Sequence, residues 1–299
     1  MNEIIIYIIN LFASLLKNYP LTIICVTLLF KLVIMPLDLY QKKNSRKTAA
    51  LSEEVESIKK RYKDQNQQNQ KIQELYRKNG VNTLATGCLP LVVQIVLLFS
   101  FFGALRTLMA QQTSSLIIDA AINGAENVKL PGWLWINNFW QPDSGFSSTM
   151  PSVDELFKFL QQNITNISPE NLYMLKNSGI INFGAEGITI ATETYEKLSA
   201  AVLAANGLTG LANGWFGLPI LTGITTWLSQ KLSMANQDEA SAEQMKSMMF
   251  VMPFMSGWFC LTSNSGFAVY WLVSNIYQII FALIINAVYK AKDNKAQKA

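Results

Sequence analysis

The sequence predicts an all-α integral membrane protein with five transmembrane helices around a hydrophilic groove. Half of its 299 residues are apolar and only 15% are charged, whereas a soluble domain carries about 25% charge. The charged residues are also absent from several long segments and concentrated in those between them. We therefore also expect a cytoplasmic helical hairpin, an external interfacial helix and a small external insert.

The first predicted span, residues 20–40, contains a lysine near its middle. Lys31 follows Leu21 by ten residues, about 15 Å of helix and roughly half of the ~30 Å hydrocarbon layer. The next basic residue, Lys42, is too distant for the Lys31 side chain to reach the headgroups beside it. On a lone helix such a lysine costs about 2.5–3.5 kcal/mol. Together with Thr27 one turn earlier, it predicts a hydrated cavity within the membrane.

The segment before this span, residues 1–19, is predicted to form an external interfacial helix. Its apolar run at 4–16 has thirteen residues, too few to span a bilayer. Only Glu3 precedes it, without the basic region or small-residue cleavage site of a secretory signal. An N-terminal anchor is the alternative interpretation.

Residues 41–82 are predicted to be a cytoplasmic helical hairpin. They carry eleven Lys and Arg residues, which places them in the cytoplasm and the N-terminus outside. Apolar residues recur at helical spacing in both arms, and we expect the polar run DQNQQNQ at 64–70 to be the turn between them. Because acids are interleaved with the bases, a solvated face that sets topology is favoured over a nucleic-acid site. Contact of this segment with lipid headgroups is a further alternative.

The rest of the chain alternates between apolar and polar segments. The predicted segments are span two at 83–108, an external region at 109–215, span three at 216–234, a cytoplasmic loop at 235–247, span four at 248–264, span five at 266–289 and a basic cytoplasmic tail at 290–299. Five spans with the N-terminus outside and the C-terminus inside satisfy each charge asymmetry.

The external region, with four lysines and nine acids, divides into two parts. The first concentrates tryptophans and suits an aromatic belt at the outer interface: Trp133, Trp135 and Trp140. The second, about 144–214, has the composition of a small, mainly helical domain. We expect helices to begin after Ser152 and Ser168 and at Thr192, and a hairpin in INFGAEGITI.

Several polar residues within the predicted spans are candidates for lining the groove. They are Lys31, Thr27, Gln94, Thr226, Gln230, Ser274 and Asn275. The alternative for the uncharged ones is hydrogen bonding between spans, and for Lys31 a structural partner such as a carbonyl freed near Pro36. The chain has no histidine, and its three cysteines lie apart in apolar stretches. We therefore expect no enzymatic activity, cofactor or metal site.

With these elements in place, the chain resembles the YidC/Oxa/Alb family of membrane protein insertases. The likeness covers all five spans in order, and these motifs carry it: LTIICVTLLFKLVIMPL, KNGVN followed by GCLPLVVQ, LWI with PD, LPILTGITTWLSQK and SGFAVYWLVSNIYQ. The resemblance implies a groove open to the cytoplasm and to lipid, with Lys31 as its basic residue, Thr27 as its threonine and Trp271 as the aromatic residue that contacts the substrate.

The chain departs from that pattern at several places, and two of them concern the basic residue and the external region. The family usually has arginine at the Lys31 position, so a planar fork is exchanged for a point charge. The insert at 144–214 has no counterpart in the pattern. The resemblance is to the type found in single-membrane bacteria, and the absence of a transit peptide or of a large domain before span one indicates a bacterial plasma membrane.

The function expected from the residues and the resemblance is protein insertion. A wet groove with a central positive charge would attract short hydrophilic segments of nascent membrane proteins, and their apolar helices would leave into lipid. The resemblance implies contact with the Sec translocon, the ribosome and the signal-recognition-particle receptor, with a monomer sufficient and no direct nucleic-acid recognition. The alternative is an ion channel or transporter in which Lys31 lines an anion pathway.

Overall fold

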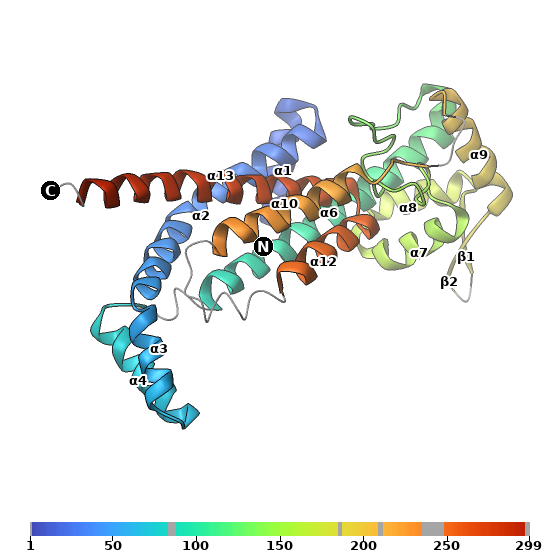
Figure 1. Cartoon of the computed structure of the whole chain (residues 1–299). Helices are drawn as coiled ribbons and strands as arrows, with labels where there is room; N and C mark the ends of the chain where they lie inside the picture. Colours follow the sequence, from blue (N-terminus) through green and yellow to red (C-terminus); the bar gives the residue numbers. More distant parts are fainter. Residues whose placement is uncertain (1, 83–87, 185–186, 209–211, 235–247, 297–299) are drawn as a thin grey trace. The chain divides into compact units, whose positions relative to one another are not determined.

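The computed structural model describes residues 2–82, 88–184, 187–208, 212–234 and 248–296, and most of them are helical (Figure 1). The loop predicted at 235–247 and the first residues of span two, 83–87, lie outside the described residues. The α-helices are α1 (Asn2–Leu16), α2 (Tyr19–Ala50), α3 (Ser52–Arg61), α4 (Gln65–Lys78), α6 (Cys88–Asn123), α7 (Val153–Asn163), α8 (Pro169–Asn177), α9 (Thr192–Ala205), α10 (Gly217–Met234), α12 (Met248–Thr262) and α13 (Ser265–Ala296).

Within the described residues, three helices are long and apolar enough to cross a membrane. They are α2, α6 from Val92 onward, and α13 as far as Lys292. Helix α10 has 18 residues and α12 has 15, about 27 Å and 22 Å at the helical rise. The described part of the chain is thus mostly helical with three long apolar helices, which is consistent with the predicted all-α membrane protein, whereas the count of five spans stays a prediction.

Three of these helices continue past the predicted ends of their spans. Helix α2 runs ten residues beyond 40, α6 ends at Asn123 instead of 108, and α13 includes most of the predicted tail. The extensions contain alanine, lysine, glutamine and arginine, which favour helix, and no proline or glycine breaks them in the printed sequence. A change from apolar to polar composition marks a membrane boundary but does not end a helix.

The chain divides into two compact units, each of which includes parts of the long helices. The insert unit consists of Met1–Ile24, Ser100–Leu221 and Gly257–Tyr270. The hairpin unit consists of Cys25–Phe99, Thr222–Ser256 and Trp271–Ala299.

The insert unit contains the small domain expected at 144–214. Helices α7, α8 and α9 and the antiparallel strands β1 (Ile181–Gly184) and β2 (Gly187–Ile190) lie together (Figure 1). The caps confirm the sequence predictions: Ser152 forms a capping box with Glu155, and Ser168 accepts from the Asn171 amide. The core of the domain also includes Ala110, Ile117 and Ile118 of α6, so it extends beyond the predicted insert.

Asp143 is a buried charged residue in the insert unit that ties several of its segments together. Its side chain is 0% exposed and accepts hydrogen bonds from Trp135 Nε1 at 2.9 Å, the Trp215 amide at 3.1 Å and the Leu218 amide at 2.6 Å. The Leu218 amide belongs to the first turn of α10, where a carboxylate is favoured by unpaired N–H groups and by the helix dipole. This residue therefore fixes where α10 begins.

The prediction of a tryptophan belt at the outer interface is partly wrong. Trp140 is only 2% exposed and packs edge-on against Tyr19 and Phe139. Trp133 and Trp135 are half-buried. Trp140 is therefore a core residue of the insert unit and not a ring at the lipid interface.

The hairpin unit contains the predicted helical hairpin. Helices α3 and α4 lie side by side (Figure 1), and Lys47 of α2 donates to the Gly80 carbonyl at 2.9 Å near the end of the hairpin. The predicted turn at 64–70 is wrong, because Asp64 caps α4 by accepting from the Gln67 amide and the glutamine-rich run is helical. Glutamine is a good helix former, and a side-chain cap at Asp64 outweighs the polar composition.

Candidate functional site

Lys31 is buried in the hairpin unit. Its side chain is 7% exposed on α2, and its Nζ lies 6.0 Å from the centroid of the Tyr277 ring on α13. That distance is at the outer limit of a cation–π contact. Thr27, one turn earlier on α2, is 1% exposed. The structure thus places both predicted residues inside the protein, on one face of the helix.

Asp38 is a site residue that the sequence interpretation missed. It follows Lys31 by seven residues, which is two helical turns and about 10 Å, so both side chains are on the same side of α2. The Asp38 carboxylate is close enough to the Lys31 ammonium and to the Tyr277 hydroxyl for electrostatic interaction. The signal was present in the sequence as a second charge, at i+7, in the same apolar segment.

A hydrogen-bonded polar cluster joins α10, α12 and α13 in the hairpin unit. Asn275 Nδ2 donates to Thr226 Oγ1 at 2.8 Å and to Thr225 Oγ1 at 3.1 Å. Ser256 Oγ lies 3.0 Å from Thr226 Oγ1. Thr226 and Asn275 therefore form hydrogen bonds between helices, which is the alternative interpretation that the sequence left open for them.

Other buried polar atoms of the hairpin unit have no hydrogen-bond partner among the described residues. They are Asp38 Oδ2, Thr222 Oγ1, Gln230 Oε1, Ser274 Oγ and Tyr277 Oη. The Asp38 carboxylate and the Tyr277 hydroxyl are close enough for a weak hydrogen-bonding interaction with each other, although neither Asp38 Oδ2 nor Tyr277 Oη has a partner at full hydrogen-bonding geometry among the described residues. Buried polar groups are nearly always hydrogen-bonded to protein or water. Such a set therefore suits an interior that takes up water or a polar ligand.

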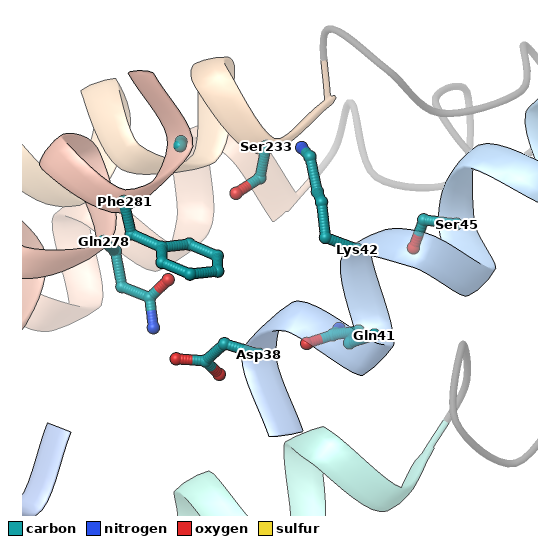
Figure 2. A pocket seen from close by; sticks show the side chains of 8 residues that line it. Asp38, Gln41, Lys42, Ser45, Ser233, Gln278 and Phe281 are labelled. Atoms are coloured by element: carbon teal, nitrogen blue, oxygen red, sulfur yellow. The ribbon is translucent and has the colours of Figure 1, made fainter. Parts of the chain in front are cut away.

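A small pocket opens beside Asp38 in the same unit (Figure 2). Its volume is about 70 Å³, enough for a few water molecules. The lining residues are Asp38, Gln41, Lys42 and Ser45 of α2, Ser233 of α10, and Gln278, Phe281 and Ala282 of α13. Figure 2 shows Lys42 extended toward Ser233, whereas Asp38 and Gln278 both point into the space between α2 and α13.

The remaining predicted residues are less enclosed. Trp271 of α13 is half-buried, and Gln94 of α6 is exposed. Gln94 therefore lies outside the buried cluster. The assignment of the eight predicted residues to a groove stays a prediction, although seven of them are at least half-buried in one compact unit.

Comparison with known proteins identifies a family over nearly the whole chain. The model of the family described as 60Kd inner membrane protein matches residues 11–186 and 186–293. The chain is 26% identical over its full length to Membrane protein insertase YidC 2 of Bacillus anthracis, of which it covers 81%. It is 27% identical over 94% of its length to Membrane protein insertase YidC of Fusobacterium nucleatum, of which it covers 92%, and 24% identical over its full length to Membrane protein insertase MisCA of Bacillus subtilis, of which it covers 81%. With its apolar helices, the chain is a bacterial membrane protein that belongs to the 60Kd inner membrane protein family, together with the YidC insertases.

Proposed function

We propose that this protein is a membrane protein insertase that works through a hydrophilic groove in the hairpin unit. The observation that carries the proposal is a buried lysine, Lys31, in a helix apolar enough to span a bilayer. It lies in the same unit as buried polar atoms that have no partner at hydrogen-bonding geometry among the described residues. The relatives named above are insertases by name. Buried polar groups without partners destabilise a protein core. A path for a polypeptide, in contrast, requires polar groups that can bind it.

The mechanism follows from the cost of moving polar groups through hydrocarbon. A short hydrophilic segment of a nascent chain meets about 30 Å of apolar core. A wet groove that reaches Lys31 removes roughly half of that distance, and the ammonium attracts acidic side chains of the segment. The adjacent apolar helix of the substrate moves into lipid, with Trp271 as its contact. No covalent step is required.

The proposed topology has five spans, with α10 and α12 crossing in addition to the three long helices. The hairpin of α3 and α4, with the other bases of residues 41–82, is cytoplasmic by the positive-inside rule, and the insert faces outward. The exposed basic surface of the hairpin is the proposed contact for the ribosome, the Sec translocon or the signal-recognition-particle receptor. Gln94, Gln230 and Ser274 are proposed to keep the groove polar.

Insertion by the full chain reconstituted in liposomes tests the proposal. The probe is a single-span protein with a short acidic N-terminal tail, and protection of the tail from added protease measures its translocation. We expect Lys31→Ala to lower translocation at least tenfold and Lys31→Arg to retain it. The matched control is Lys59→Ala, which removes an exposed lysine from α3. Equal translocation by wild type and Lys31→Ala would reject the groove, and ion flux without substrate would favour a channel.

A further inference from the structure

Asp38 is the buried charge that the proposed mechanism does not use. Its Oδ2 atom is buried without a hydrogen-bond partner among the described residues. It interacts electrostatically with Lys31, and its side chain lines the pocket between α2 and α13 (Figure 2). A carboxylate in this position is costly unless something compensates it. The Tyr277 hydroxyl compensates it in part, and the structure offers two further sources of compensation.

The first source is the chain's own lysine. Lys31 and Asp38 are two turns apart on one helix face, about 10 Å along the axis. This is the separation of the two backbones along the helix. The two side-chain charges interact, so each offsets the field of the other. A substrate segment that approaches this site therefore meets two opposite charges. The negative group lies at the pocket, and the positive group lies about two helical turns deeper in the span.

The second source is the pocket itself. Asp38 and Gln278 point into it, and Gln41 and two serines, Ser45 and Ser233, add oxygen atoms to its wall. Lys42 is extended toward Ser233 and away from the carboxylate (Figure 2). The Asp38 carboxylate is thus left available to a cation that enters from the pocket, and ammonium and guanidinium groups are the cations that polypeptides carry.

We propose that Asp38 determines the charge specificity of the groove by accepting basic side chains of the substrate's translocated segment and by opposing acidic ones before they reach Lys31. The proposal rests on the proposed insertase function. It predicts that this chain translocates tails containing lysine or arginine better, and acidic tails less well, than a groove with Lys31 alone.

The test compares two single-span substrates that differ only in the translocated tail, one with two aspartates and the other with two lysines. Full-length protein in liposomes translocates each, and the ratio of the acidic to the basic tail is the measurement. We expect Asp38→Asn to raise this ratio roughly fivefold. A fivefold change corresponds to about 1 kcal/mol, which is the order of one charge–charge interaction in a partly hydrated site. Asp38→Glu should restore the wild-type ratio.

Three controls separate the possible outcomes. Glu53→Gln removes an exposed acid from α3 and should leave the ratio unchanged. Lys31→Gln should lower it. If Asp38→Asn does not fold, Asp38→Ser replaces it, with thermal melting in detergent as the check.

The failures of the two proposals differ. If wild type translocates neither tail better than empty liposomes, the insertase function fails. If wild type translocates both and Asp38→Asn keeps the wild-type ratio, the role of Asp38 is overturned while the function stands. A change in ratio that Glu53→Gln reproduces would also overturn it, because bulk charge would then be the cause.

Discussion

The two compact units differ in how they pair a buried aspartate and a buried tyrosine. In the insert unit, Asp143 accepts three hydrogen bonds, and the Tyr195 hydroxyl donates to the Pro151 carbonyl at 2.6 Å. In the hairpin unit, Asp38 Oδ2 and Tyr277 Oη are buried without partners among the described residues. An aspartate and a tyrosine are therefore fully hydrogen-bonded in the insert unit, whereas the corresponding pair in the hairpin unit has atoms without such partners.

This contrast distinguishes buried polar groups that stabilise the fold from those that are retained for binding. A satisfied buried polar network makes a fold specific and rigid, and the insert unit uses its network to hold α10 at Leu218. An unsatisfied set costs stability and is retained where another molecule completes it. This contrast supports the proposal that substrate passes through the hairpin unit, with the insert unit as a scaffold. Matched substitutions in the two units test this difference.

The largest expected difference is between Asp143→Asn and Asp38→Asn. Asp143→Asn replaces one of the two accepting oxygens by an N–H₂ group that faces at least one of the three donors, so we expect a loss of about 3 kcal/mol in the free energy of unfolding. For Asp38→Asn, relief of desolvation and loss of attraction to Lys31 oppose each other, and we expect a change within about 1 kcal/mol. Unfolding in mixed detergent, followed by tryptophan fluorescence, measures both. A larger loss at Asp38 would contradict the comparison.

The second pair removes one hydroxyl from each unit. Tyr195→Phe leaves the Pro151 carbonyl unpaired in the core, and we expect it to cost about 1–3 kcal/mol. Tyr277→Phe removes a hydroxyl that interacts with Asp38 but has no partner at full hydrogen-bonding geometry among the described residues, so we expect a smaller loss than at Tyr195. The same unfolding assay measures the pair. Equal losses of unfolding free energy for the two variants would mean that the Tyr277 hydroxyl is hydrogen-bonded in the folded protein as firmly as the Tyr195 hydroxyl.

The Tyr195 hydroxyl also predicts a pH dependence. Burial is the main cause that raises the pKa of Tyr195, with the Glu155 charge adding to it. The unfolded chain releases this proton near pH 10, while the folded protein keeps it. Stability is therefore unaffected below pH 10 and falls above it by about 1.4 kcal/mol per pH unit until the folded pKa is reached. The difference in this slope between wild type and Tyr195→Phe is the measurement, and identical slopes would contradict the burial argument.

Much of the fold could be predicted because local chemistry determines it. Ser152 and Ser168 cap helices where expected, and Gly179 and Gly207 adopt positive φ just after the helices they follow. Helix ends near the membrane were predicted less well. The sequence marks where apolar composition stops at residue 108, but α6 continues to Asn123 because its last turns pack into the insert core, and periodicity alone does not show such packing.

The site was predicted in part for a similar reason. Lys31 stands out in its sequence because a charge in an apolar segment is rare. Asp38 lies at the edge of the same segment, where acids are common, so only its spacing from Lys31 and its position beside Tyr277 reveal it. The roles of Asn275 and Thr226 depend on tertiary contacts between α10 and α13, which spacing on a single helix does not specify.

The smallest expected difference is between neighbouring residues of α13, Asn275→Ala and Ser274→Ala. Asn275 bonds to α10 through Thr225 and Thr226, and a hydrogen bond between membrane helices contributes about 0.6 kcal/mol. Losing these bonds should therefore cost roughly 1 kcal/mol, with little effect on translocation apart from that loss. Ser274 Oγ has no partner among the described residues, so Ser274→Ala should leave stability unchanged and reduce translocation by making the groove drier. Unfolding in detergent and protease protection of the acidic-tail substrate measure the two effects. A stability loss at Ser274 equal to that at Asn275 would assign both residues to helix packing, and the polarity of the groove would then depend on the remaining candidates, such as Lys31, Asp38 and Gln230.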